Sequence, residues 1–379
     1  MKTISTIVIQ LFIFLLVISG IEAQVTGGFL CGGYQRTYTV YVPSTWSPGG
    51  QYPLLIALHG LTQTGNEMML FSGFNTIAED NRFLVVYPDG VLTSWNVGFP
   101  GGSTADDVGF LSALIDTLNT RYSVDLTRVY ATGFSNGGFM CYRLGCELGN
   151  RIAAIASVSG TMTDGSLAAC QPQRLIPVMH IHGTNDYVVP FNGGYGNQSV
   201  NAVLSFWTNY NNCPALPVVV DLPDLVPEGS TVQTQTWSPC DDTTEVKFYK
   251  VLNGGHAWPG SVIATGSGLT NEDINASQEI WNFVSRFTLD LTTGIRSFTH
   301  GSFVIYPNPA IESVTIRFPR LIQPGLLELY NACGIKVMDR AISSGLTTFG
   351  LHLESLPRGL YFVRVSSGVS HYSGKLTVE

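Results

Sequence analysis

The fold is decided by residues 128–137, which read Arg-Val-Tyr-Ala-Thr-Gly-Phe-Ser-Asn-Gly. Arg128–Ala131 predicts a buried strand, and a helix is expected to begin at Asn136. Glycines lie two residues before and two residues after Ser135, where a sharp turn from strand to helix leaves room only for small residues. This stretch therefore predicts a strand–turn–helix unit that presents a serine nucleophile above the edge of a sheet.

Apolar runs and helical patterns alternate on both sides of this stretch. Further strands are predicted at Arg36–Val42, Pro53–Leu58, Phe83–Tyr87, Ile152–Val158, Ile176–Ile181 and Val246–Val251. Helices are predicted at Glu67–Asp80, Asp107–Arg121 and Ser277–Leu289, where apolar residues recur at helical spacing. This alternation predicts an α/β fold with a doubly wound sheet and helices on both faces.

The pattern changes near residue 300, so two domains are expected. After Ser302, seven short strand-like runs separated by turn residues follow one another without a helical pattern. Residues 302–379 are therefore predicted to form a small all-β, immunoglobulin-like sandwich. Residues 24–290 are assigned to the α/β domain, and residues 291–301 to a linker.

The first 23 residues predict a secretory signal peptide. Lys2 supplies a positive charge, Ile7–Ser19 is apolar, and Ala23 is a small residue suited to cleavage before Gln24. The apolar run is short for a membrane-spanning helix, which favours a cleaved signal over an anchor. We therefore expect a secreted protein, extracellular or attached to the cell surface, with no membrane span after cleavage.

Composition and cysteine usage narrow the function further. Hydrophobic residues make up 45% of the chain, charged residues 12%, and the net charge is −8. The acidic balance argues against binding to nucleic acid or to an anionic membrane. None of the seven cysteines forms a C-x-x-C pair, and we expect no metal or cofactor. Export permits disulfides, and Cys213 and Cys240 are predicted to pair because they flank a proline-rich excursion.

A serine nucleophile needs a base and an acid that orients the base. In this strand–turn–helix class they follow the serine in the order acid, then histidine. Asp186 directly follows a predicted strand, and His256 lies in a glycine-rich loop after the strand Val246–Val251. Because the carboxyl ends of strands line the crevice of such sheets, Ser135, Asp186 and His256 are predicted to form the catalytic triad.

Other residues compete for these roles. His180 and His182 lie in or at the end of a predicted strand, where packing or loop shaping is the better interpretation. Asp164 is the alternative acid, in a loop after the strand Ile152–Val158.

An oxyanion hole needs two backbone donors near the serine. One is predicted to be the N–H of Asn136, and the other the N–H of Leu61 in the loop after the strand Pro53–Leu58. His59 is expected to shape that loop. Loop aromatics beside these motifs are candidates for substrate binding, although they could equally be packing residues: Trp95, Tyr187 and Trp258.

These motifs resemble the polyhydroxybutyrate depolymerase and feruloyl/acetyl-xylan esterase group of carbohydrate esterase family 1, an α/β-hydrolase family. The resemblance is carried in order by residues 58–63 (L-H-G-L-T-Q), 95–96 (W-N), 107–110 (D-V-G-F), 130–138 (Y-A-T-G-F-S-N-G-G), 180–186 (H-I-H-G-T-N-D) and 254–260 (G-G-H-A-W-P-G). It implies the same triad and a serine carboxylic-ester hydrolase. The family often has methionine where Phe139 stands.

The tail resembles a second family, the C-terminal sorting domain of the bacterial type IX secretion system. Residues 306–310 (Y-P-N-P-A), 356–365 (L-P-R-G-L-Y-F-V-R-V) and 375–378 (K-L-T-V) carry this resemblance. It implies that the type IX secretion machinery is a partner of this domain. The family usually has a polar residue where Cys333 stands, so Cys333 is the candidate unpaired thiol.

Four functions fit these patterns. The first is an esterase that removes feruloyl or acetyl groups from xylan in plant cell walls, and the second is a polyhydroxybutyrate depolymerase. A third is a non-catalytic adhesin, which would have no reason to keep a triad. A fourth is a peptidase of the prolyl-oligopeptidase kind, which normally carries a large propeller before the hydrolase domain.

Overall fold

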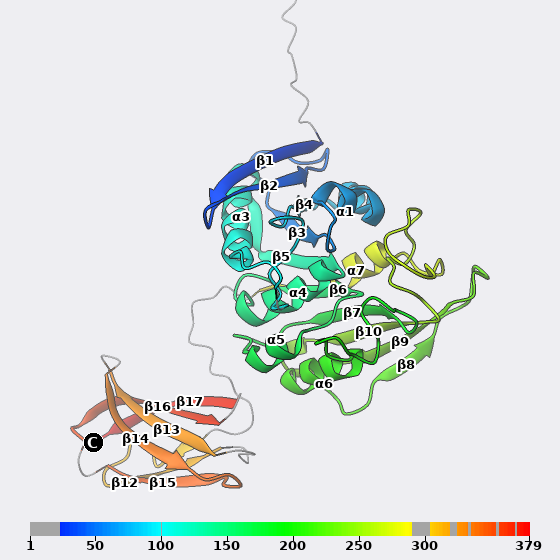
Figure 1. Cartoon of the computed structure of the whole chain (residues 1–379). Helices are drawn as coiled ribbons and strands as arrows, with labels where there is room; N and C mark the ends of the chain where they lie inside the picture. Colours follow the sequence, from blue (N-terminus) through cyan, green and yellow to red (C-terminus); the bar gives the residue numbers. More distant parts are fainter. Residues whose placement is uncertain are drawn as a thin grey trace, which may run out of the picture. The chain divides into compact units, whose positions relative to one another are not determined.

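The structure is a computed structural model that describes residues 23–99, 101–289, 304–318, 324–332, 335–353, 356–367 and 370–379. The predicted signal peptide, apart from its last residue, the predicted linker and Cys333 lie outside these residues. The chain divides into two compact units, Met1–Leu291 and Thr292–Glu379 (Figure 1). No helix among the described residues is long and apolar enough to cross a membrane.

The first unit is built on a ten-stranded sheet. In spatial order its strands are β1 (Gln24–Cys31), β2 (Tyr34–Tyr41), β4 (Leu84–Pro88), β3 (Tyr52–Leu58), β5 (Val124–Phe134), β6 (Ala154–Val158), β7 (Val178–Gly183), β10 (Val246–Leu252), β9 (Thr231–Trp237) and β8 (Val218–Asp221). The six strands from β4 to β10 pair in parallel, and the two strands at either edge pair antiparallel.

Helices cover both faces of this sheet, as alternate side chains of β3 show. Leu54, Ile56 and Leu58 pack in one core with α3 (Asp107–Tyr122), α4 (Asn136–Glu147) and α6 (Val200–Tyr210). Leu55 and Ala57 pack in the opposite core with α1 (Gly65–Ser72), α2 (Phe74–Asn81) and α7 (Ala276–Val284). A short helix, α5 (Asp164–Ala169), follows β6. This is the doubly wound sheet of an α/β-hydrolase.

The structure differs from the predicted elements in several places. The single helix expected at Glu67–Asp80 is two helices, because Gly73 has a left-handed backbone (φ 64°) that ends α1 and starts α2. The strands β1, β8 and β9 and the helices α5 and α6 were not predicted. All four residues of β8 are exposed. Its sequence, Val-Val-Val-Asp, lacks the alternation of apolar and polar residues by which a half-buried strand is predicted.

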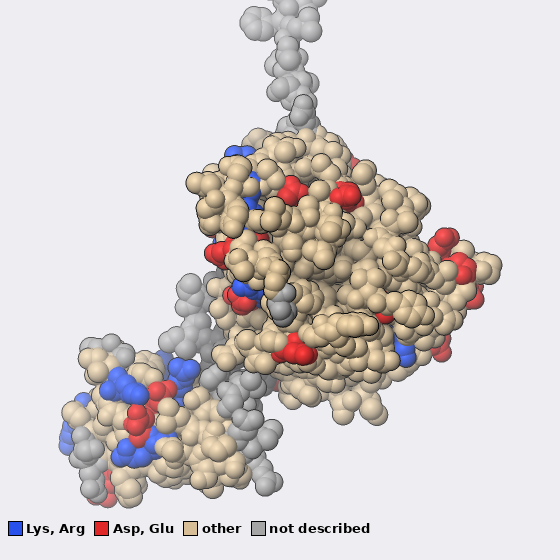
Figure 2. Space-filling view, in the orientation of Figure 1, with Lys and Arg blue, Asp and Glu red and all other residues tan. Residues whose placement is uncertain are grey.

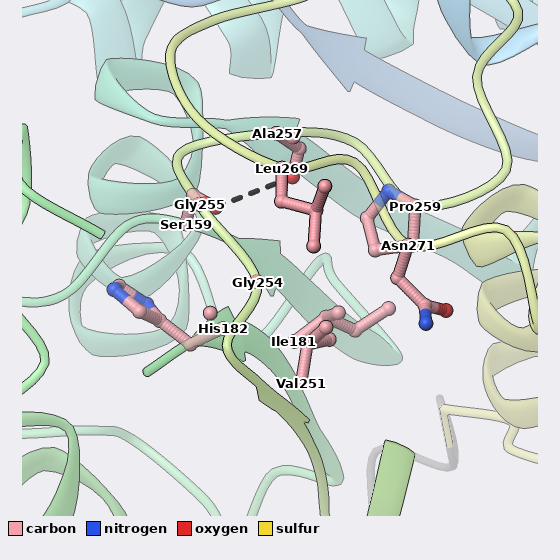
Figure 3. Close-up of a pocket in the computed structure, with 11 residues that line it drawn as sticks. Ser159, Ile181, His182, Val251, Gly254, Gly255, Ala257, Pro259, Leu269 and Asn271 are labelled. Atoms are coloured by element: carbon pink, nitrogen blue, oxygen red, sulfur yellow. Dashed lines mark hydrogen bonds between the residues drawn. The ribbon is translucent and has the colours of Figure 1, made fainter. Parts of the chain in front are cut away.

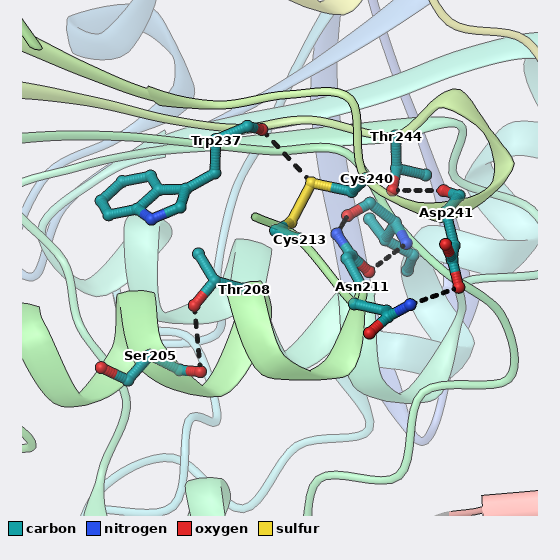
Figure 4. The surroundings of a disulfide bond; sticks show 10 residues. Ser205, Thr208, Asn211, Cys213, Trp237, Cys240, Asp241 and Thr244 are labelled. Atoms are coloured by element: carbon teal, nitrogen blue, oxygen red, sulfur yellow. Dashed lines mark hydrogen bonds between the residues drawn. A yellow bond between two sulfur atoms is a disulfide. The ribbon is translucent and has the colours of Figure 1, made fainter. Parts of the chain in front are cut away.

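Two disulfides staple the first unit. Cys213–Cys240, the predicted pair, joins the segment after α6 to the turn after β9 (Figure 4). Nearby, Asn212 donates to Asp241, so the two ends of the excursion are held by a side-chain hydrogen bond as well. The second bond is Cys146–Cys170, and the free thiols among the described residues are Cys31 and Cys141.

The second unit consists of two antiparallel sheets around its own core. One sheet has the order β11 (Val304–Tyr306), β12 (Ser313–Arg317), β15 (Thr348–His352), and the other β14 (Lys336–Ile342), β13 (Gly325–Asn331), β16 (Gly359–Ser367), β17 (Ser370–Val378). Lys and Arg side chains gather on the visible face of this unit, whereas the visible face of the first unit carries few charged side chains (Figure 2).

Candidate active site

Ser135 stands at the junction of β5 and α4 in a strained backbone conformation. Its φ is 52° and its ψ is −116°, values that a non-glycine residue adopts only when the surroundings enforce them. Its N–H donates to the carbonyl of Val158 on β6 at 2.9 Å. A Cβ atom on Gly137 would lie 2.2 Å from the carbonyl oxygen of Leu58, so a glycine is required where α4 crosses the end of β3.

The structure brings Ser135, His256 and Asp186 together in one hydrogen-bonded row. His256 Nε2 lies 2.9 Å from Ser135 Oγ, and His256 Nδ1 lies 2.7 Å from Asp186 Oδ2. The three residues follow β5, β10 and β7, whose carboxyl ends lie at the same edge of the sheet. The alternative acid, Asp164, instead lies at the start of α5, where it accepts a hydrogen bond from Gln198.

Asp186 is buried and held by four donors. The backbone N–H groups of Val188 and Val189 donate to its Oδ1 at 2.9 and 2.8 Å. Its Oδ2 lies 2.7 Å from His256 Nδ1 and 3.3 Å from His182 Nε2. Burial by itself would raise the pKa of Asp186, but the hydrogen bonds from His182 and His256 outweigh it and lower the pKa below its ordinary range. The carboxylate therefore stays ionised.

The loop that carries His256 is fixed to a neighbouring segment. The backbone groups of His256 and Ser267 exchange two hydrogen bonds, and the N–H of Gly255 donates to the carbonyl of Leu269 (Figure 3). A cavity of about 10 Å³ lies beneath this loop, room for no more than about one water molecule. On the triad side the ring of Phe134 packs 4.9 Å from the imidazole of His256. The imidazole is thus held in place from several sides.

The two backbone N–H groups predicted to form an oxyanion hole are not used elsewhere among the described residues. Those of Leu61 and Asn136 have no hydrogen-bond acceptor in the part of the chain that the structure describes. Gln63 fixes the loop of Leu61, since its Oε1 accepts from the N–H of Gly60 and its Nε2 donates to the carbonyl of Thr265, in the segment that neighbours the His256 loop. Asn136 also begins α4, where the helix dipole favours an anion.

His59 is buried beneath the same loop and acts as a structural residue. Its Nε2 accepts from the N–H of Gly90, which leaves the proton on Nδ1 to donate to the carbonyl of Gly60 at 2.7 Å. Burial lowers the pKa of His59 below its ordinary value, so the imidazole is neutral. Its own carbonyl accepts from the indole of Trp95.

A cavity of about 710 Å³ opens beside the serine. Ser135, Asn136 and Leu61 all contribute to its wall. Its described lining residues include no charged side chain: Tyr34, Leu61, Val91, Leu92, Ser94, Trp95, Val97, Phe99, Gly101, Gly102, Ser103, Thr104, Ala105, Ser135, Asn136, Phe139, Val188, Val189, Tyr195 and Asn197. A neutral ligand of drug-like size would fit such a site.

Residues 33–248 match the family model Esterase. The chain belongs to this esterase family. Over 261 residues it is 33% identical to the bifunctional acetylxylan esterase/xylanase XynS20E of Neocallimastix patriciarum, covering 68% of this chain and 34% of that protein. It is 28% identical to feruloyl esterase B of Piromyces equi, covering 67% of this chain and 46% of that protein.

The chain thus spans about a third to a half of the length of these two relatives. Among solved structures, the acetyl xylan esterase from Aspergillus awamori aligns with a TM-score of 0.49 at 15% identity, over 69% of this chain and 99% of that one. Residues 304–379 match the family model Secretion system C-terminal sorting domain. The tail of the chain is therefore a type IX C-terminal sorting domain, which indicates secretion or attachment at the cell surface.

The structure corrects one predicted substrate contact of the esterase domain and qualifies two others. Trp258 is only 1% exposed, packs among Phe71, Phe74 and Phe134, and donates to Ser277, so it belongs to the core. Trp95 lies in the cavity wall but is also 1% exposed. Tyr187 is exposed but is absent from the cavity lining.

Other aromatic residues line the esterase cavity and were not predicted: Tyr34, Phe99, Phe139 and Tyr195. Tyr195 could have been predicted from the sequence, because it stands between glycines in Gly193-Gly194-Tyr195-Gly196. In the structure it is 89% exposed. An isolated aromatic residue in a glycine-rich loop has little reason to be there for packing. Tyr34 and Phe99 gave no such signal.

One cluster of acidic side chains also occurs among the described residues of the esterase domain. Asp224, Glu228 and Asp273 have carboxylate oxygens within 4.8 Å of one another. Asn271 donates to two of these carboxylates, and backbone N–H groups donate to Asp273. Exposed acidic groups often gather without an ion, and we assign no metal site here.

Proposed function

We propose that this protein hydrolyses carboxylic esters through an acyl-enzyme on Ser135, with His256 as general base and Asp186 as the orienting acid. The observation that carries the proposal is the row of hydrogen bonds from Ser135 Oγ to His256 Nε2 (2.9 Å) and from His256 Nδ1 to Asp186 Oδ2 (2.7 Å). A base within hydrogen-bond reach of a hydroxyl, itself held by a third group, is the arrangement that activates a serine.

The steps follow from these positions. Ser135 Oγ attacks the ester carbonyl while His256 Nε2 takes its proton, and the N–H groups of Leu61 and Asn136 donate to the oxyanion. The imidazolium then protonates the departing alcohol, which leaves the acyl group on Ser135. A water molecule deprotonated by His256 then attacks this acyl group. The bond from the acyl carbon to Ser135 Oγ breaks, Oγ takes the proton back from His256, and the carboxylic acid leaves. Asp186 keeps the imidazole in the required tautomer throughout.

The substrates that we propose are feruloyl or acetyl esters on plant cell-wall polysaccharide. The relatives' names support this class, since one is an acetylxylan esterase and another a feruloyl esterase. The cavity supports it as well, because its described lining carries no charge and includes the aromatic side chains of Phe99, Phe139 and Tyr195. A planar neutral acyl group would pack against such rings.

One observation favours a second candidate, a polyester depolymerase. Apolar side chains stand exposed at the cavity, among them Leu92 (91% exposed), Tyr195 (89%) and Leu61 (57%). An exposed apolar rim would suit contact with an insoluble polyester such as polyhydroxybutyrate.

Hydrolysis of methyl ferulate, acetylated xylan and polyhydroxybutyrate by the same preparation would separate these candidates. The first proposal requires release of ferulate or acetate with little or no attack on the polyester. Strong activity on polyhydroxybutyrate with none on the other two would establish the second candidate. A folded protein inactive on all three, and on p-nitrophenyl acetate, would point to a non-catalytic adhesin.

A further inference from the structure

The triad continues inward through a buried row of side chains that the reaction itself does not use. Tyr142 on α4 lies with its hydroxyl 2.7 Å from His180 Nδ1, and His180 Nε2 lies 3.2 Å from His182 Nδ1. His182 Nε2 then lies 2.9 Å from the carbonyl of Val189 and 3.3 Å from Asp186 Oδ2. Tyr142, His180 and His182 are all at most 1% exposed.

The proton positions in this row follow from its ends. The carbonyl of Val189 can only accept, so His182 Nε2 carries a proton and shares it between that carbonyl and Asp186. A His182 ring that carries this one proton has a bare Nδ1, which accepts from His180 Nε2–H. A neutral His180 in turn has a bare Nδ1, which accepts from the hydroxyl of Tyr142. All donors therefore point toward Asp186.

The ring of His180 meets the condition for this assignment. Burial, with His182 alongside, lowers the pKa of His180 well below its ordinary value, which keeps His180 neutral. The titratable groups facing the row are Tyr142 from α4, Asp186 and His256. Lys250 of β10 lies farther away, with its Nζ 5.7 Å from the ring of Phe191, which packs edge-on against His182.

We propose that His182 is a positioning residue for the triad, which holds Asp186 so that Oδ2 faces His256, and whose own tautomer is fixed by Val189 and His180. This inference rests on the proposed function. The two N–H donors from Val188 and Val189 both reach Oδ1, so they locate one carboxylate oxygen and leave the other to be fixed from its own side. His182 supplies that second constraint, because its Nε2 lies 3.3 Å from Oδ2.

Two substitutions that differ by one methylene test this role. His182→Gln places an amide N–H where Nε2 stood and can still reach Asp186. His182→Asn ends where Nδ1 stood, can still accept from His180, and falls short of Asp186. With p-nitrophenyl acetate we expect His182→Asn to lower kcat by about 10- to 100-fold, the effect of losing a hydrogen bond to a buried charge, while KM stays within threefold. His182→Gln should stay within tenfold of the parent kcat.

Tyr142→Phe is the matched control, because it removes a hydrogen bond from the same buried row without touching Asp186. It should lower the melting temperature and leave kcat within threefold. Stoichiometric labelling by a fluorophosphonate would count the folded, competent enzyme in each preparation. An inactive parent or an active Ser135→Ala variant would refute the proposed function, independently of His182.

Three results would overturn the positioning role. One is a kcat for His182→Asn within threefold of the parent, and another is a loss in Tyr142→Phe as large as that in His182→Asn. The third is a loss of more than a hundredfold in folded His182→Gln, which decides the matter even where the Asn variant does not fold.

Discussion

Ser135, His256 and Asp186 depend on one another through two hydrogen bonds, so their substitutions should not be equivalent. His256→Ala removes the base, and we expect kcat to fall on the order of 10⁶-fold. Asp186→Asn keeps the imidazole in place but offers it an amide instead of a carboxylate, and we expect a loss of about 10⁴-fold. Turnover of p-nitrophenyl acetate measures both. Equal losses, or a larger loss in the Asn variant, would contradict the roles assigned here.

The buried imidazole of His180 predicts a dependence of stability on pH. Because its folded pKa lies well below the value of about 6.5 in an unfolded chain, the unfolded state binds this proton first as the pH falls. The contribution is fully present above about pH 6.5 and is lost as the pH falls toward the folded pKa. Melting temperatures at pH 7.5, 6.5 and 5.5 should therefore drop less steeply for His180→Gln than for the parent. Parallel curves would show that His180 titrates alike in both states.

Among the elements, the crossing of α4 over the end of β3 sets the geometry of the turn that carries Ser135. Gly137→Ala would place a Cβ atom 2.2 Å from the carbonyl oxygen of Leu58 and 2.7 Å from that of His59. The backbone must move, at a cost of about 1–3 kcal/mol in the free energy of unfolding, and Ser135 must move with it. We expect a lower melting temperature and a loss of esterase activity.

Gly165→Ala is the control for that substitution. Gly165 lies in α5, and a Cβ atom there meets nothing within 4 Å. Alanine is the better helix former by about 1 kcal/mol, so this variant should be as stable as the parent or more so, and fully active. If both variants have the same melting temperature and activity, the close approach at Gly137 does not constrain the turn that carries Ser135.

The ends of strands explain what could be predicted from sequence and what could not. Ser135, Asp186 and His256 each follow a buried strand closely, and the carboxyl ends of parallel strands meet at one edge. Their proximity was therefore readable from local patterns. The burial of Trp258 was not, because the rings that cover it, Phe71 and Phe74, come from helices almost 200 residues earlier. The same holds for Tyr34, which reaches the cavity from β2.

At the scale of the whole molecule, the two units keep separate cores. The two hydrophobic clusters of the first unit include residues only up to Leu289, and the cluster of the second begins at Ile305. We therefore expect residues 24–299, produced without the sorting domain, to unfold cooperatively and to keep a kcat/KM within threefold of the full chain. Thermal unfolding and turnover of p-nitrophenyl acetate measure this. An insoluble or inactive product would mean that the sorting domain belongs to the catalytic unit.

The central claim is that ester hydrolysis passes through Ser135, and one substitution tests it most directly. Ser135→Ala removes a single oxygen atom from a residue whose N–H still donates to Val158. The measurement is the turnover of methyl ferulate and p-nitrophenyl acetate by this variant, beside its thermal unfolding. The account predicts an unchanged unfolding profile and a kcat lower on the order of 10⁶-fold. Activity within tenfold of the parent, from a folded variant, would contradict it.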